Sequence, residues 1–373
     1  MKTGFIILAL FILTSVNCFA QYTTDKVVGK KHQSLADSLK NSEYPYILPI
    51  WGAKVVKKGF DLPYSAGLGI NYLAQTSNIK IENLRVGFNH KEPLNLDGLV
   101  RFDKAISRLQ SVNVRPDVWL FPFLNVYGIL GVGKGSTEVG YGVWVTDSTG
   151  TDKQVFSSNT KVEFQTTTFG FGITPTMGIG GFWFAGDMNF TWSDIPQLNE
   201  PAFAFVFGPR LGKNLRFKNP SKSVSIWVGG FRLSINAGTT GSVNMSDIYS
   251  SADLDAKISN GYAKIEENQK GVDQWWSDLT PVEQKNPVNV AKYETATAAS
   301  ARAGQALANV ENAGNKIESS SVQYSIDKSP ATKWNFLIGT QFQINKHWMI
   351  RAEYGFLSQR TQFIGGLQYR FGL

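Results

Sequence analysis

Few side chains in this sequence could do acid–base or nucleophilic chemistry. It has three histidines, His32, His90 and His347, and one cysteine, Cys18. A hydrolase of the Ser–His type needs a histidine beside its nucleophile, and a zinc site needs His or Cys at ligand spacing. No pair of these residues has ligand spacing, and only His90 lies where we expect a substrate to reach it. We therefore expect no catalytic residues, no metal and no cofactor.

Charged residues in alternating segments form a stronger candidate set. They occupy the polar positions of segments in which apolar and polar residues alternate, so they should share one face of a sheet. With five arginines and three acids, they would slightly favour anions if they lined a water-filled pore. They could equally brace a filled interior. The set is Arg85, Arg115, Asp117, Asp187, Arg210, Arg351, Glu353 and Arg370.

Long segments with a period of two must position these charges. The clearest are "FWFAGDMNFTWS" (182–193), "KWNFLIGTQFQIN" (333–345) and "HWMIRAEYGFL" (347–357). Strands of soluble sandwiches run to about five or six residues, whereas strands that cross a membrane need about nine to eleven. The polar faces carry Gly, Asn, Gln and charge, which suit a wet interior. The pattern predicts a transmembrane antiparallel up-and-down β-barrel, an all-β fold.

The expected strand number is about 12, within a range of about 10 to 14, because such barrels have even numbers of strands. A first strand is expected at 46–57, and Gly229 and Gly230 indicate a bulge in the strand at 223–236. The other strands are expected at 64–73, 79–90, 109–120, 123–134, 163–176, 182–193, 201–211, 333–345, 347–358 and 361–373.

Aromatic and apolar residues at the ends of these strands predict a girdle at the membrane surfaces. The last strand keeps its apolar face up to the final residue, so it should pair with the first strand and close the barrel. The girdle set is Trp192, Trp334, Trp348, Tyr369, Phe371 and Leu373.

The N-terminus has the pattern of an export signal. A basic Lys2, an apolar run and small residues up to Ala20 predict a signal peptide at 1–20 that is cleaved and takes Cys18 with it. Residues 21–45 are expected to form a periplasmic segment, and 46–373 the barrel. The net charge of +8 comes from scattered residues, so we expect no nucleic-acid partner.

One connection differs from the rest of the chain. From Ser251 to Leu279, apolar residues recur at three- or four-residue spacing, and an Ala-rich stretch follows from Val288 to Val310. Prolines in "LTPVEQKNP" separate the two stretches. The pattern predicts an α-helical hairpin at 250–320, inserted in a barrel loop.

At the C-terminus the residues resemble a known family. The girdled strands and the ending "LQYRFGL" resemble Gram-negative outer-membrane β-barrel proteins, and "RPDVWLFPFLNVYGILG" and "GDMNFTWSD" resemble a porin-like group among them. The resemblance implies a place in the cell outer membrane, contact with its lipid, and recognition of the last strand by the barrel-assembly machinery. In this family the last residue is more often aromatic. Here the last residue is Leu373, and the aromatic Phe371 lies two residues before it.

Three functions remain open on these grounds. The first is a passive channel for small solutes with a narrow, slightly basic lumen. The second is a non-conducting barrel that anchors the helical hairpin for a binding partner. The third and weakest is an outer-membrane lipid hydrolase, which would have to use His90.

Overall fold

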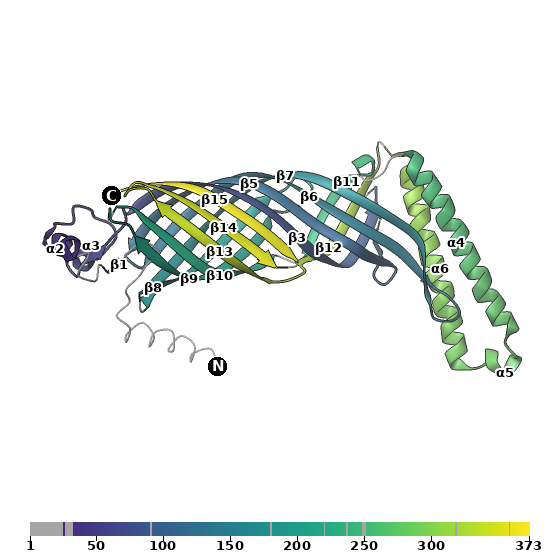
Figure 1. The fold of residues 1–373 in the computed structure, drawn as a ribbon. Helices are drawn as coiled ribbons and strands as arrows, with labels where there is room; N and C mark the ends of the chain where they lie inside the picture. Colours follow the sequence, from purple (N-terminus) through teal and green to yellow (C-terminus); the bar gives the residue numbers. More distant parts are fainter. Residues whose placement is uncertain are drawn as a thin grey trace.

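The computed structural model describes residues 25–26, 33–89, 92–179, 181–219, 221–235, 238–247, 251–317, 319–357 and 359–373. Ten antiparallel strands close into a barrel, and the last of them pairs with the first (Figure 1). In chain order the ring consists of β3 (Ala66–Phe88), β5 (Val100–Phe121), β6 (Leu124–Thr146), β7 (Asp152–Ile179), β8 (Phe182–Asp194), β9 (Ala202–Arg216), β10 (Ser223–Ile235), β13 (Trp334–Gln343), β14 (Trp348–Leu357) and β15 (Arg360–Phe371). The closed antiparallel barrel agrees with the expected fold class.

The ring of ten strands lies within the expected range of 10 to 14 but has two fewer than the expected 12, and two segments explain the difference. The strands predicted at 64–73 and 79–90 are one strand, because the polar stretch between them continues the ladder, with Thr76 opposite both Arg108 and Thr361. The segment 46–57 is not a strand. Pro49 has no N–H to donate to a ladder, and Gly52–Val56 forms the short helix α3.

The ring is taller on one side than on the other. Strands β13 and β14 have 10 residues each, while β7 has 28. Where the short strands end, three further strands complete the wall: β4 (Leu94–Asn95), β11 (Gly238–Asn244) and β12 (Ser321–Pro330). Both β4 and β12 pair with the C-terminal part of β3, and β11 pairs with β12. Leu198, in the loop after β8, bridges to Gly241 of β11. We divide the barrel along its axis into two halves. The band half is the end near the C-terminus, in which all ten strands of the ring run. The hairpin half is the other end, which is enclosed by the long strands of the ring together with β4, β11 and β12.

A helical hairpin lies across the end of the hairpin half (Figure 1). It consists of α4 (Ser251–Asp278), α5 (Pro281–Gln284) and α6 (Pro287–Gly314), and it follows the 3-10 turn η2 (Met245–Asp247). The Asn286 side chain accepts a hydrogen bond from Val288 N and begins α6. Leu307 of α6 is buried against Val143 and Phe156 of the rim. The hairpin is therefore packed onto the barrel at Leu307, while its α5 end projects beyond the rim (Figure 1).

Among the described residues, no helix is both long enough and apolar enough to cross a membrane.

The opposite mouth is covered by residues that precede the barrel, including β1 (Asp25–Lys26), α2 (Gln33–Asn41) and β2 (Phe60–Asp61). The backbone N–H groups of Ile47 and Leu48 donate to the carbonyl of Leu373, at 2.9 and 3.2 Å. Asp61 forms an ion pair of 2.8 Å with Arg216 at the end of β9, which stands across the ring from β3. The lead-in segment therefore reaches from one side of this mouth to the other.

Candidate functional site

The outer surface of the barrel changes character along its length. In the band half, outward side chains are large, apolar and exposed on every strand of the ring, as a lipid-facing surface requires. Examples from different strands are Ile70, Val112, Leu130, Phe171, Phe184, Leu211, Val228, Phe336, Tyr354 and Leu367. The closed ring and this apolar band are the features of a transmembrane β-barrel.

The outer wall of the hairpin half carries charge instead. Arg108 and Lys104 of β5 both pair with Glu138 of β6, at 3.1 and 2.5 Å, and Lys161 pairs with Glu163 on β7. These ion pairs are exposed on the sheet. Hydrated charge of this density belongs in water rather than in hydrocarbon.

The residues expected in the girdle lie on the outer surface of the band half. Trp334, Trp348, Tyr369, Phe371 and Leu373 are between 38% and 51% exposed. Trp192 is half-buried because its ring stacks on Phe169, with centroids 5.8 Å apart. Their use as an insertion signal stays a prediction.

Inside the band half, four of the expected lumen charges form one network, which we call the charged plug. Arg210 donates to both oxygens of Glu353, at 2.9 and 3.0 Å, and it also pairs with Asp187. Arg351 pairs with Glu353 as well, and the indole N–H of Trp227 donates to Glu353 at 3.0 Å. All the carboxylates are buried and compensated, as buried charge requires.

Three more expected charges lie closer to the C-terminal mouth. Arg370 Nη2 is 2.9 Å from Asp117 Oδ1, and Asn125 donates to the same oxygen at 2.8 Å. Arg115 stands apart from this pair, with its guanidinium 3.4 Å from the centre of the Tyr127 ring. Arg370 on β15 therefore pairs with Asp117, separately from the pair of Arg351 and Glu353 on the neighbouring strand β14.

Arg85 is the one expected lumen residue that the structure places elsewhere. Its side chain is exposed, while Leu84 and Val86 face the interior. Up to Ile81 the odd-numbered residues of β3 point inward. Asn83 then adopts a left-handed backbone with φ of 54°, opposite a register shift in β12. A bulge of this kind adds one residue and moves later side chains to the other face.

Two cavities share the barrel interior. The cavity in the band half has a volume of about 70 Å³, and the one in the hairpin half has about 700 Å³. Asn71, Arg115, Asp187 and Arg351 line both of them. The charged plug and its neighbour Arg115 therefore form the constriction between a nearly filled lumen and a wide chamber.

The larger chamber is mainly apolar. Its walls come from inward residues of the tall strands, from β12 and from the face of α6 that carries Leu307 and Val310. Tyr141 and Phe156 lie beneath this helix. The hairpin thus provides the chamber with its end wall. Volumes of about 300–1,000 Å³ with mostly apolar walls are typical of sites for small molecules.

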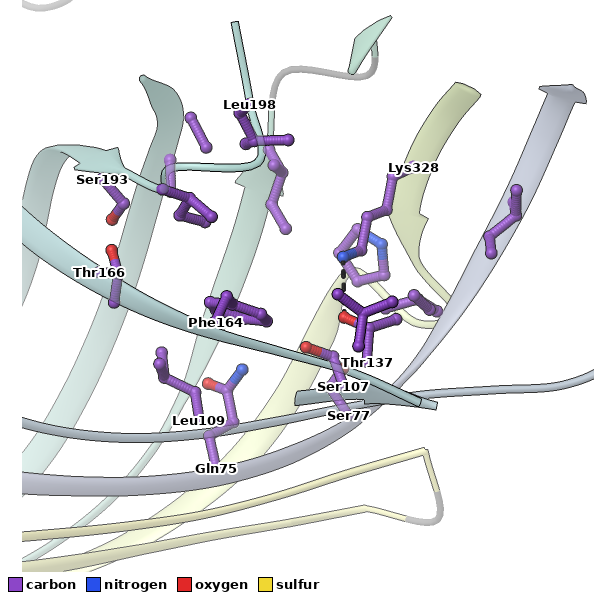
Figure 2. Close-up of a pocket in the computed structure, with 18 of the residues that line it drawn as sticks. Gln75, Ser77, Ser107, Leu109, Thr137, Phe164, Thr166, Ser193, Leu198 and Lys328 are labelled. Atoms are coloured by element: carbon purple, nitrogen blue, oxygen red, sulfur yellow. Dashed lines mark hydrogen bonds between the residues drawn. The ribbon is translucent and has the colours of Figure 1, made fainter. Parts of the chain in front are cut away.

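Two interior cations were not among the sequence candidates. Lys328 of β12 points into the chamber, with its Nζ 3.4 Å from the Thr137 hydroxyl (Figure 2). Arg360, at the first position of β15, is only 2% exposed. The sequence predicts no strand at Lys328, although Val322, Tyr324 and Ile326 alternate before it. Arg360 precedes the predicted strand 361–373 by one residue.

The histidines offer no catalytic set in the described residues. His32 and His90 lie outside those residues. The Nδ1 atom of His347 lies 2.8 Å from the carbonyl of Arg370, and its ring stacks on Tyr369. Within the described ranges, no three His, Cys, Asp or Glu side chains gather as a metal site would need. The expectation of a non-enzyme without a metal remains a prediction.

No protein-family model matches the sequence, and no curated protein matches it. Among solved structures, it is similar to the beta domain of the Bordetella autotransporter BrkA, with a TM-score of 0.33, 7% identity, and coverage of 82% of this chain and 100% of that one. It is also similar to the translocator domain of the autotransporter NalP from Neisseria meningitidis, with a TM-score of 0.31, 10% identity, and coverage of 85% of this chain and 92% of that one. For an outer membrane channel from Pseudomonas putida F1, the TM-score is 0.26 and the identity 8%, with coverage of 83% of this chain and 96% of that one. Scores this low carry no argument about function.

Proposed function

We propose that this protein is an outer-membrane barrel that passes small solutes along its axis, and that the structure is its closed state. The observation that carries the proposal is the pair of cavities on either side of the charged plug, which have lining residues in common. A barrel that served only as an anchor would not need a chamber of about 700 Å³ above a polar constriction.

The orientation follows from the two ends of the barrel. Short turns join the strands beside the C-terminus, and the helical hairpin lies at the other end. Outer-membrane barrels have short periplasmic turns and longer external loops. The hairpin half then lies outside the cell, and the lead-in segment and Leu373 lie in the periplasm. The predicted signal peptide at 1–20, which is outside the described residues, would deliver the chain there, and the last strand would be read by the barrel-assembly machinery.

Within the set expected from the sequence, the lumen charges are less unbalanced than predicted, while Lys328 and Arg360 add two interior cations outside that set. With Arg85 outside, four arginines face three acids in the expected set, and six of these seven charges are paired with one another. Polar solutes must therefore separate ion pairs in order to pass. A solute with an apolar part can enter the chamber first, which favours small apolar or amphipathic solutes.

Conductance and solute entry test this proposal. The full chain in a planar bilayer should give small, infrequent currents, and Arg351→Ala should enlarge them because Arg351 borders both cavities. The matched control is Lys134→Ala, an exposed change on the outer wall. If neither the wild type, nor Arg351→Ala, nor a chain without residues 250–320 gave any current or solute entry in vesicles, the channel proposal would fail.

A non-conducting barrel that displays the hairpin remains the second candidate, and the charged plug favours it. The hairpin also has apolar residues that face away from the barrel, with Val282 81% and Val288 61% exposed near its tip. If the barrel never conducts, this tip is where a partner would dock. A lipid hydrolase stays third, and the absence of lipid cleavage by the wild-type protein would remove it.

A further inference from the structure

We propose that the chamber of the hairpin half binds a carboxylate amphiphile, whose head lies at Lys328 and whose apolar body lies toward the hairpin. This inference rests on the proposed function and names its class of solute. It does not depend on the charged plug, which lies deeper in the barrel.

A row of polar residues crosses the wall at one level of the chamber. In the strand register, Ser77 of β3 is opposite Arg360 of β15 on one side and Ser107 of β5 on the other, and Ser107 is opposite Thr137 of β6. Ser77, Ser107 and Thr137 all line the chamber, and Figure 2 shows them close together below Lys328. The hydroxyls of Ser107 and Thr137 can each donate a hydrogen bond to an anion, whereas the Ser77 hydroxyl already donates to the carbonyl of Asn78 at 3.2 Å.

Lys328 brings a positive charge to this row. It projects from β12, which lies outside the ten strands of the ring, and the Thr137 hydroxyl is its hydrogen-bonding partner at 3.4 Å. Among the described residues, no carboxylate forms an ion pair with it. A cation held inside an apolar chamber without a counter-ion loses much of its hydration, so an anion that enters the chamber is attracted to it.

Arg360 adds a second cation at the other end of the row. Its Nε donates to the Ser77 hydroxyl at 3.2 Å and its Nη2 donates to the carbonyl of Thr332 at 3.0 Å. Its Nη1 is buried and has no hydrogen-bond partner in the structure, and the guanidinium lies 5.5 Å from the centre of the Phe231 ring. Arg360 therefore fixes the Ser77 hydroxyl and leaves the row electropositive.

The walls above this level suit an apolar body. They include Phe88, Leu96 and Leu307, from a tall strand, a loop and the hairpin. The ion pair of Arg108 with Glu138, on two of the tall strands, lies on the outer surface. A ligand with a charged end and an aliphatic chain satisfies both parts of the chamber, whereas a fully polar solute would leave the apolar part exposed to water.

The experiment uses the full chain in phosphatidylcholine nanodiscs and three probes of equal length: dodecanoate, dodecanol and dodecylammonium. Calorimetric titration should give the tightest binding for dodecanoate. Since hydrogen bonds to charged groups contribute about 1.5–3 kcal/mol, Lys328→Met should weaken dodecanoate binding by about tenfold or more and leave dodecanol binding unchanged. Lys328→Arg should retain binding, and Lys134→Met is the matched surface control.

Several results would overturn the inference. They are equal affinity for dodecanoate and dodecanol in the wild type, an equal loss in Lys328→Met and Lys134→Met, and competition from phosphatidylglycerol added to the nanodisc, which would make the ligand a membrane phospholipid. Vesicle entry of the same probes is measured in parallel. Binding without entry would refute the channel and leave the site standing, whereas entry without carboxylate preference would refute only the site.

Discussion

The two halves of the barrel are inverted with respect to each other. The band half is apolar outside and charged inside, with a cavity of about 70 Å³, whereas the hairpin half is charged outside and mainly apolar inside, with a cavity of about 700 Å³. The strands β3, β5, β6 and β7 run through both halves without a break. One strand can therefore serve two solvents, provided that its alternation reverses where the surroundings change.

The reversal has a clear cost in each half. Buried ions in the band half are stable only while every charge keeps its partner, because removing one partner leaves an uncompensated charge. An empty apolar chamber in the hairpin half gives up the contacts that a filled core would have. The first arrangement suits a closed passage, and the second suits a space that a ligand fills.

Removal of a charge from the plug should have the largest effect. In Arg210→Met, Asp187 keeps the Thr174 hydroxyl but loses its cation, and breaking a buried pair costs about 3–5 kcal/mol. Urea unfolding of the vesicle-inserted barrel should show a loss of this order. An unchanged urea midpoint would mean that the lumen of the band half is hydrated and that the charged plug does not exist.

A smaller and local loss is expected at the contact between the hairpin and the rim. Leu307 is 2% exposed, and Leu→Ala changes at such sites cost about 2–5 kcal/mol. Leu307→Ala should speed proteolytic removal of α4 and α6 while the band half remains intact. Val282→Ala, at the exposed tip, is the control. Equal cleavage of the two variants would show that the hairpin does not rest on the rim.

The affinity for dodecanoate should fall at high pH. Burial lowers the pKa of the Lys328 ammonium from its ordinary value of 10.5, so the side chain becomes neutral, and loses its attraction for a carboxylate, at a lower pH than an exposed lysine does. Burial also raises the pKa of Tyr324 on the same strand, which keeps that residue neutral. The other charged groups along the chamber and its floor are Arg115, Asp187, Arg210, Arg351, Arg360 and Glu353.

Calorimetric titration of dodecanoate at increasing pH checks this prediction. Binding should decline toward the level of Lys328→Met as Lys328 loses its proton, and the binding of dodecanol should stay constant. A decline of the same size in Lys328→Met would assign the titration to another group.

The smallest effect is expected at an ion pair on the outer wall of the hairpin half. Arg101 pairs with Asp152, where the two side chains are 47% and 34% exposed, and ion pairs at the surface contribute about 0–1 kcal/mol. Asp152→Asn should therefore change the urea midpoint by much less than Arg210→Met does. A loss as large as that of Arg210→Met would mean that the outer wall is not hydrated.

Period-two alternation predicted the band half well, since its strands at 182–193, 333–345 and 347–358 agree closely with β8, β13 and β14. In the band half, side chains point alternately to lipid and to the lumen, so the alternation of apolar and polar residues can be seen in each strand by itself. The helical spacing of Leu254 and Ile258 likewise corresponds to α4. These features are local to the sequence.

The hairpin half was predicted less well because its structure depends on partners distant in sequence. The side that Arg85 takes depends on a bulge at Asn83 opposite β12. Lys328 faces a chamber lined by residues from every strand of the ring, from β4 and β11, and from α6. Pro49 lies in a segment whose contacts are with the last residue of the chain and with the end of β5. The alternation of residue types within one segment cannot predict contacts with residues that are distant in the sequence.

The inversion itself is the central claim, and spin-label accessibility tests it most directly. Single cysteines labelled with a nitroxide at 112, 228 and 338 should collide with oxygen but not with a water-soluble nickel complex when the barrel is in vesicles. Labels at 104, 134 and 161 should collide with the nickel complex. If the second set were as protected from nickel as the first, the membrane would cover both halves, and the chamber would not lie outside it.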